Sequence, residues 1–210
     1  MKRVLVLAGM STFLFAACVS NPDGNKAETT EAVETATASE GADLTVSPTT
    51  SSVTWTGKKV TGEHTGDVQI KDGSIKVKDG KIVGGKIVLD LNTINVKDLE
   101  GEYKGKLETH LKSGDFFDVA THPEAVLEIT DVKDGATPGT AVVSANLTIR
   151  GITKNITFDA NVAEASDSAV KANADFNIER EDWNVSFAGK PDDLISKQIN
   201  FKINLEAAAI

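Results

Sequence analysis

The sequence predicts an all-β fold, an antiparallel β-barrel of about eight strands with one short helix covering an end. Apolar and polar residues alternate through most of the chain after residue 43, which indicates strands with one buried and one solvated face. Pairs of turn-forming residues separate the alternating runs. One stretch, residues 98–113, has the apolar spacing of a helix. Because a long open sheet exposes unpaired edges, we expect it to close into a barrel.

The first 17 residues have the features of a bacterial lipoprotein signal peptide. A basic start is followed by an apolar run, Val4–Ala17, that is too short to span a membrane. The small residues that end this run directly precede Cys18, the only cysteine of the chain. We expect residues 1–17 to be removed and Cys18 to become a lipidated N-terminus. The alternative is an ordinary secretory signal with an unmodified Cys18, and in either case a single cysteine excludes an internal disulfide.

Residues 18–43 are expected to form a disordered acidic tether after the lipidated cysteine. The segment is rich in Ala, Thr, Ser and Glu, and valine is its only larger apolar residue type. One lysine and six acidic residues give it a net charge of −5. Such a composition buries too little apolar surface to offset the conformational entropy that ordering removes.

Residues 44–210 are predicted to be one domain, long enough to bury a core. Their 19 basic and 25 acidic side chains give a net charge of −6, and no basic stripe is present, so a nucleic-acid partner is not expected. Seven runs alternate strictly: 51–60, 84–96, 124–130, 141–151, 154–162, 169–180 and 197–207. Hairpin turns are expected at Asp72-Gly73, Asp79-Gly80 and Asp134-Gly135, and a bulge at Gly84-Gly85.

The inward-facing residues of these runs mix large aromatic side chains with alanines. Mixed sizes can fill the taper of a small barrel or leave an elongated apolar hollow, and a barrel of about eight strands is at the size where one small ligand can be held.

The candidate helix lies within Asp98–Ser113. Leu99, Tyr103, Leu107 and Leu111 recur every four residues and therefore share one stripe. Glycines weaken the first part of the segment, so we expect helix mostly from Lys104 to Lys112. We expect the helix to lie across one end of the barrel.

The alternation breaks at Thr109–Ala125, with the sequence THLKSGDFFDVATHPEA. This stretch holds two of the three histidines, and two interpretations are open: a catalytic constellation, or part of the wall of a binding cavity. The helix carries no His-x-x-x-His pair, and the chain has no Gly-x-Ser-x-Gly nucleophile motif. We therefore expect no metal ion, no cofactor and no catalytic residue. The alternative is an envelope enzyme that acts on an isoprenoid or a small molecule through His110, Asp115 and His122.

Five short motifs in order give a family resemblance: Leu111–Ser113, Asp115–Asp118, His122-Pro123, Leu147–Lys154 and Ile178–Arg180. In this combination the chain resembles the YceI-like family of polyisoprenoid-binding proteins over Leu44–Ala207. The chain departs from the family at Lys104–Glu108, where many members have an Arg-Asp pair, so the place of a ligand's polar head is left open.

The resemblance implies a lipocalin-like barrel that is exported from the cytoplasm and holds an isoprenoid quinone or polyprenyl-type lipid in its lumen. No catalytic activity is established for the family as a class. The resemblance also implies that a homodimer can form. With Cys18 lipidated, we expect a lipid-binding lipoprotein of the cell envelope. The residue after the cysteine, Val19, favours the outer membrane, with the barrel facing the periplasm or the cell surface.

The apolar residues at inward-facing strand positions, taken together with the resemblance, give a set of expected lipid-binding residues in the lumen and end wall. They are Trp55, Leu89, Leu111, Phe116, Phe117, Leu127, Ile129, Leu147, Ile149, Phe158, Ala174, Phe176, Ile178, Trp183 and Phe201. Plain core packing remains the alternative for Phe116 and Phe117. For Arg150 and Arg180, at strand ends, surface ion pairing is favoured over a polar clamp at the barrel mouth.

Overall fold

The computed structural model describes residues 19–35 and 40–209. The predicted signal peptide, residues 1–17, and the predicted lipidation site, Cys18, lie outside the described residues. Strands account for most of the described chain, and one α-helix interrupts them.

The elements follow one another in the order β1 (Asn25–Lys26), β2 (Glu28–Glu31), β3 (Ala42–Val46), β4 (Ser52–Lys59), β5 (Gly62–Lys78), β6 (Lys81–Val96), α1 (Gly101–Lys112), β7 (Glu124–Asp134), β8 (Thr140–Ile149), β9 (Ile152–Ala165), β10 (Ala169–Glu179), the 3₁₀ turn η1 (Arg180–Trp183), β11 (Gly189–Lys190) and β12 (Asp193–Ala208).

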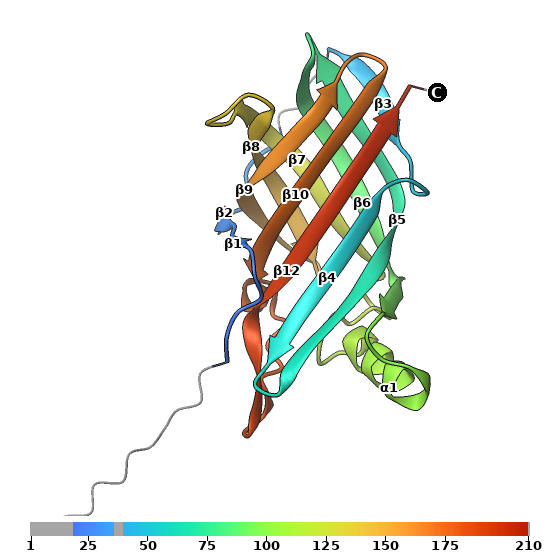
Figure 1. Cartoon of the computed structure of the whole chain (residues 1–210), viewed down its shortest axis with the longest axis vertical. Coiled ribbons are helices and arrows are strands. Elements are labelled where there is room, and N and C mark those ends of the chain that lie inside the picture. Colours follow the sequence, from blue (N-terminus) through green and yellow to red (C-terminus); the bar gives the residue numbers. More distant parts are fainter. Residues whose placement is uncertain (1–18, 36–39, 210) are drawn as a thin grey trace, which may run out of the picture.

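Eight antiparallel strands close into a barrel (Figure 1), as predicted. Going round the wall, β4, β5, β6, β7, β8, β9, β10 and β12 are each paired with the next, and β12 pairs with β4 to close the circle. The short β3 continues the wall between β12 and β5 beyond the start of β4. Helix α1 lies at the lower end of the barrel, to the right in Figure 1, so the one predicted helix is at one end of the barrel.

Helix α1 begins three residues before the expected start, at Gly101. Gly101 itself has φ +56°, a left-handed conformation that glycine adopts without strain, and this allows the turn into the helix. Leu111 is the buried residue of the helix, and the Glu108 carboxylate accepts a hydrogen bond of 2.9 Å from the Val96 backbone N–H. Lys104 of the helix also donates a hydrogen bond of 2.8 Å to the Asn95 side-chain oxygen, so two polar contacts attach the helix to the end of β6.

Register shifts in β5 and β6 change which residues face the lumen. Asp79-Gly80 forms the β5–β6 turn, as predicted, with positive φ at both residues. The expected hairpin at Asp72-Gly73 is wrong, because β5 runs through it with a register shift between Ile70 and Asp72. At this point β5 has one residue more than β6, so the chain forms a bulge instead of a turn. The strand therefore continues to a length of 17 residues.

The prediction of a disordered tether is wrong for residues 19–35. This segment lies against the barrel wall, where β1 pairs with β10 and β2 pairs with β9. The composition argument considered apolar burial alone, whereas the segment is held mainly by backbone pairing and by asparagine side chains of the wall. We call residues 21–33 the N-terminal strap.

Among residues 19–35 and 40–209, no helix has the length and apolar character needed to cross a membrane.

Candidate functional site

The lower half of the barrel, next to α1, contains an apolar cavity. It encloses about 1150 Å³ of space outside the atoms, including the part that is open to solvent. Its lining is aliphatic and aromatic with few polar groups: Val53, Trp55, Gly57, Val68, Ile87, Leu89, Leu91, Ile94, Leu111, Phe116, Phe117, Ala125, Leu127, Leu147, Ile149, Phe176, Arg180, Ile195, Ser196, Gln198, Ile199, Phe201 and Ile203. A cavity of this character suits a ligand with a long hydrocarbon chain.

A belt of aromatic side chains crosses the barrel near the upper end of the cavity. Trp55, Phe201 and Phe176 are direct cross-strand neighbours on β4, β12 and β10. Phe158 on β9 stacks on Phe176, with ring centroids 4.2 Å apart. The cavity reaches Val53 and Ile203 just above this belt, and beyond them buried aliphatic residues such as Val77 fill the barrel. The lumen is therefore packed in its upper half and hollow in its lower half.

The loop after α1 forms the opposite wall. Phe116 is buried, and its ring centroid lies 5.1 Å from that of His110 and 5.7 Å from that of Phe187. Arg150 donates hydrogen bonds to the backbone carbonyls of Gly114 and Phe116. The expected surface ion pair of Arg150 is wrong, because this arginine fastens the Phe-Phe loop to the end of β8. Phe116 and Phe117 are at once core residues and cavity wall, so both interpretations of the pair apply.

Arg180 is the one charged residue in the cavity lining, and its expected surface ion pairing is also wrong. Its side chain is 1% exposed. The guanidinium donates to the backbone carbonyls of Ser196 (2.8 Å), Val185 and Ile195. Within the described chain no carboxylate lies within 4.0 Å of it, since Glu179 and Glu181 pair with lysines instead. Burial lowers the pKa of Arg180, and the charges of these two glutamates partly oppose that shift.

Ten of the fifteen expected lipid-binding residues line the cavity. They are Trp55, Leu89, Leu111, Phe116, Phe117, Leu127, Leu147, Ile149, Phe176 and Phe201. Ile129, Phe158, Ala174, Ile178 and Trp183 do not. Phe158 lies behind Phe176, and Trp183 is fully buried in η1, with its indole N–H 2.9 Å from the Leu147 carbonyl. The alternation gave no information on where along the barrel the hollow part begins, so residues of the filled half such as Ile129 and Ala174 were included.

Thirteen cavity residues were not among the expected ones; Gly57, Val68 and Ile195 are three of them, and the other ten fall into two groups. Val53, Ile87, Leu91, Ala125, Ile199 and Ile203 have the same alternation as predicted neighbours, so the sequence pattern was sufficient to find them. Ile94 follows a bulge in β6, beyond which the other set of alternate residues faces the lumen. Arg180, Ser196 and Gln198 are polar. No apolar pattern could have indicated these four.

The structure brings together only part of the alternative His/Asp site. His110 Nε2 lies 3.4 Å from Asp115 Oδ2, at the exposed side of the α1 loop. His122 instead packs beside Gly151. In the described part of the chain, no group of three or more His, Cys, Asp or Glu side chains is arranged to bind a metal ion.

Gly66 of β5 makes room for the Trp55 indole. A Cβ at Gly66 would lie 2.3 Å from both Trp55 Cζ2 and the Asn95 carbonyl oxygen. We expect Gly66→Ala to displace Trp55 and to lower the free energy of unfolding by about 1–3 kcal/mol through overpacking. Gly57→Ala is the matched control, since nothing lies within 4 Å of its Cβ position. Chemical unfolding followed by tryptophan fluorescence checks this; equal stability of the two variants would contradict it.

The comparison with protein families agrees with this geometry. The model of the YceI-like domain matches residues 44–207. The chain belongs to the YceI-like family. The family match begins at Leu44, so the N-terminal strap lies outside the part of the YceI-like domain that the model describes.

Curated relatives support the assignment over a shorter stretch. A UPF0312 protein of Pseudomonas aeruginosa is 33% identical over 96 residues, which cover 46% of this chain and 47% of the relative. A UPF0312 protein of Azotobacter vinelandii is 32% identical over 97 residues, 46% of this chain and 48% of the relative. The chain thus aligns over about half the length of these relatives.

Solved structures of low sequence identity share the fold of this YceI-like chain. Burkholderia cenocepacia BcnA superposes with a TM-score of 0.65 at 18% identity, covering 78% of this chain and 99% of BcnA. A domain from Saccharophagus degradans, described as a polyisoprenoid binding domain implicated in plant cell wall breakdown, has a TM-score of 0.60 at 17% identity, with coverage of 81% and 100%. At these identities the likeness establishes the lipocalin-like barrel alone.

Proposed function

We propose that this protein is a lipid-binding protein that holds the hydrocarbon chain of a polyisoprenoid, or of a similar long-chain amphiphile, in the lower half of its barrel. The observation that carries the proposal is the almost wholly apolar lining of the cavity, from Trp55 at the aromatic belt to Phe116 and Phe117 at the end wall. Burying an apolar chain against such a lining stabilises the complex by roughly 25 cal/mol for each Å² removed from water.

The relationship to the YceI-like family supports the same ligand class, because one structural neighbour is described as a polyisoprenoid binding domain. An isoprenoid quinone or a polyprenyl-type lipid would fit a cavity with few polar groups. No step of this proposal needs catalysis or a cofactor. His110 and Asp115 lie on the exposed side of the loop whose Phe116 and Phe117 line the cavity.

The proposal includes attachment to the cell envelope. Cys18, if lipidated, would insert acyl chains in a membrane and keep the barrel at its surface, at the outer membrane facing either the periplasm or the cell exterior. The anchor would place the cavity near the source of its apolar ligand. Storage or transport of the lipid, as a monomer or as a homodimer, is the role that this arrangement suits.

Affinity should increase with the length of the bound chain. We expect farnesol, geranylgeraniol and solanesol, isoprenoid alcohols of increasing length, to bind with successively lower Kd until the hollow half is filled, because each added unit buries more apolar area. Quenching or shift of tryptophan fluorescence on titration measures this, and native mass spectrometry of the purified protein shows whether such a lipid is retained. Equal, weak binding of all three alcohols, with no retained lipid, would contradict the proposed function.

A further inference from the structure

The barrel wall has an incomplete seam between β9 and β10. Strands β9 and β10 are paired only at their upper ends, from Val170 opposite Ala165 to Ala174 opposite Ala160. Below Ala174, β10 continues to Glu179 and β9 continues back to Ile152 without pairing to each other. On their other edges both strands are paired over longer stretches, β10 with β12 and β9 with β8. The gap between β9 and β10 is next to the hollow half of the lumen.

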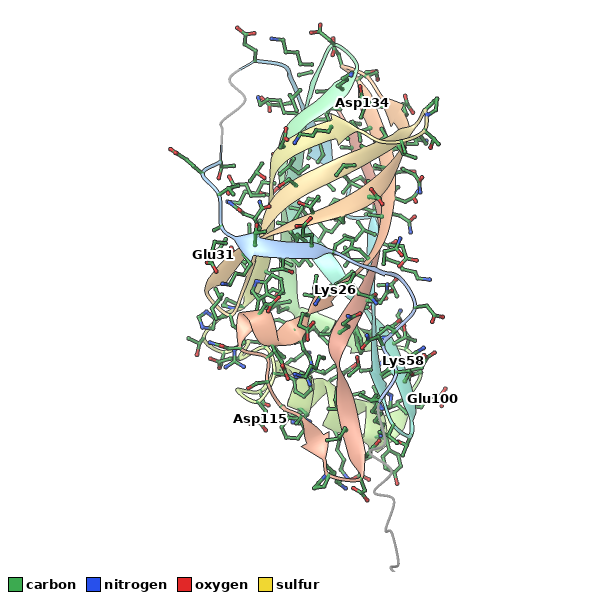
Figure 2. The ribbon with its side chains drawn as sticks, turned by 90° about the vertical axis from the view of Figure 1, so that its left-hand side faces the viewer. Lys26, Glu31, Lys58, Glu100, Asp115 and Asp134 are labelled. Atoms are coloured by element: carbon green, nitrogen blue, oxygen red, sulfur yellow. The ribbon has the colours of Figure 1, made fainter. Side chains whose placement is uncertain are left out.

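The N-terminal strap occupies this seam (Figure 2). It first pairs in parallel with β10, Asn25 opposite Phe176 and Lys26 opposite Asn177. After Ala27 it crosses to β9, where Glu28–Glu31 pair with Thr157–Lys154 in antiparallel register. Figure 2 shows this segment crossing the face of the barrel, with Lys26 and Glu31 labelled on it. Below the strap, η1 closes the rest of the gap, with Trp183 buried against β8.

The wall presents buried polar side chains to the strap. Asn177 Nδ2 donates to the carbonyls of Pro22 (2.9 Å) and Gly24 (3.3 Å), and Ser196 Oγ donates to Asn21 (2.9 Å). At the other end, Asn146 accepts a hydrogen bond from the Val33 N–H and donates one to the Val33 carbonyl. These three wall residues are among the six buried polar or charged residues of the described chain. The seam is therefore built to accept a peptide strand.

The strap is nevertheless attached more weakly than the other strands. Pro22 and Ala27 are its two buried residues, so its docking buries little apolar area. The Thr29 hydroxyl is buried without a hydrogen-bond partner, which disfavours the docked state. The ion pair between Lys154 and Glu31 is largely exposed on the glutamate side and contributes little. Segments with few buried apolar contacts open at the lowest free-energy cost.

Cavity residues lie directly behind the strap. Phe176, opposite Asn25, and Ser196, bonded to Asn21, both line the cavity. Leu147 lines it as well and pairs with Lys154, to which the strap is bound. We propose that the β9–β10 seam is a side entrance to the lipid cavity and that the N-terminal strap is its gate. The proposal rests on the proposed function and adds to it the route by which the ligand enters.

A reversible cross-link of the strap tests the gate. In a full-length Cys18→Ser background, Glu28→Cys and Thr157→Cys place two thiols at directly opposed positions of β2 and β9. With the disulfide formed, we expect uptake and release of a quinone with a geranylgeranyl tail to slow at least about tenfold, and to recover on reduction. Trp55 in the cavity wall reports binding by fluorescence quenching. The control pair, Lys171→Cys with Glu206→Cys, cross-links β10 to β12 away from the seam and should leave the rates unchanged.

Two further outcomes separate the gate from the proposed function. Equal exchange rates of oxidised and reduced protein, with normal binding at equilibrium, would overturn the gate and leave the lipid-binding function intact. Hydrogen exchange tests the gate without any ligand: the amides of residues 25–31 should exchange faster than those of paired β8 and β9. If the amides of residues 25–31 were protected as well as those of β8 and β9, the strap would not open and the gate would be overturned. This result does not depend on whether the quinone binds to the oxidised or the reduced protein.

Discussion

Replacing Arg180 with methionine is expected to lower the free energy of unfolding by about 3–5 kcal/mol. The substitution preserves a long, unbranched side chain but removes the donors that now bond the carbonyls of Ser196, Val185 and Ile195. Carbonyl groups left buried without a partner each cost about 1–3 kcal/mol. The apolar side chain recovers part of this free energy because the guanidinium is no longer desolvated. Urea unfolding, with the slope held equal to that of wild type, measures the difference.

Lys197→Met is the control for this prediction. Lys197 lies next to Ser196 in the sequence, but its side chain is exposed and its ion pair with Glu181 is on the surface. Its loss should change stability by less than about 1 kcal/mol. If the Arg180 variant were no less stable than this control, the arginine would not be holding η1 and β12 together. The buried guanidinium would then need another explanation, such as a contact with the bound lipid.

Most of the barrel could be predicted from the sequence because its strands and turns depend on residues that are close to one another in the chain. Period-two alternation determines which face of each strand is buried, and the Asp79-Gly80 turn has a conformation that few other residue pairs adopt. The bulges could not be predicted in the same way. A register shift depends on how a strand pairs with its neighbour. In β6, Leu91 and Ile94 both face the lumen although they are three residues apart, and this spacing is determined by tertiary structure.

The N-terminal strap could not be predicted because its partners are distant in the sequence. Its composition is that of a disordered segment, and only two of its residues are buried. What orders it is an unpaired edge on each of β9 and β10, together with Asn146 and Asn177 in the wall. These asparagines looked like ordinary outward-facing positions of alternating strands. Their role became visible only once the seam between β9 and β10 was known.

Blocking the cavity is expected to have the largest effect on ligand binding. The alanine suited to this is Ala125 of β7, which lines the hollow half of the barrel opposite Leu89 of β6. Ala174, one of the expected lipid-binding residues, does not line the cavity, because it pairs with Ala160 at the upper end of the seam and packs in the filled half of the barrel. A bulky residue at Ala174 would therefore disturb the filled half of the barrel instead of closing the channel.

We expect Ala125→Phe to reduce the affinity for geranylgeraniol at least about tenfold, equivalent to about 1.4 kcal/mol. The new ring would occupy the space between the β6 and β7 walls that the hydrocarbon chain needs. Because this space is empty of protein atoms, overpacking should cost no more than about 1–3 kcal/mol of stability. Ala163→Phe, at an exposed position of β9, is the matched control and should bind as wild type does. Fluorescence titration and thermal unfolding of both variants decide the matter: a folded Ala125→Phe protein with undiminished affinity would place the ligand outside the lumen, because no chain could share that part of the cavity with the ring.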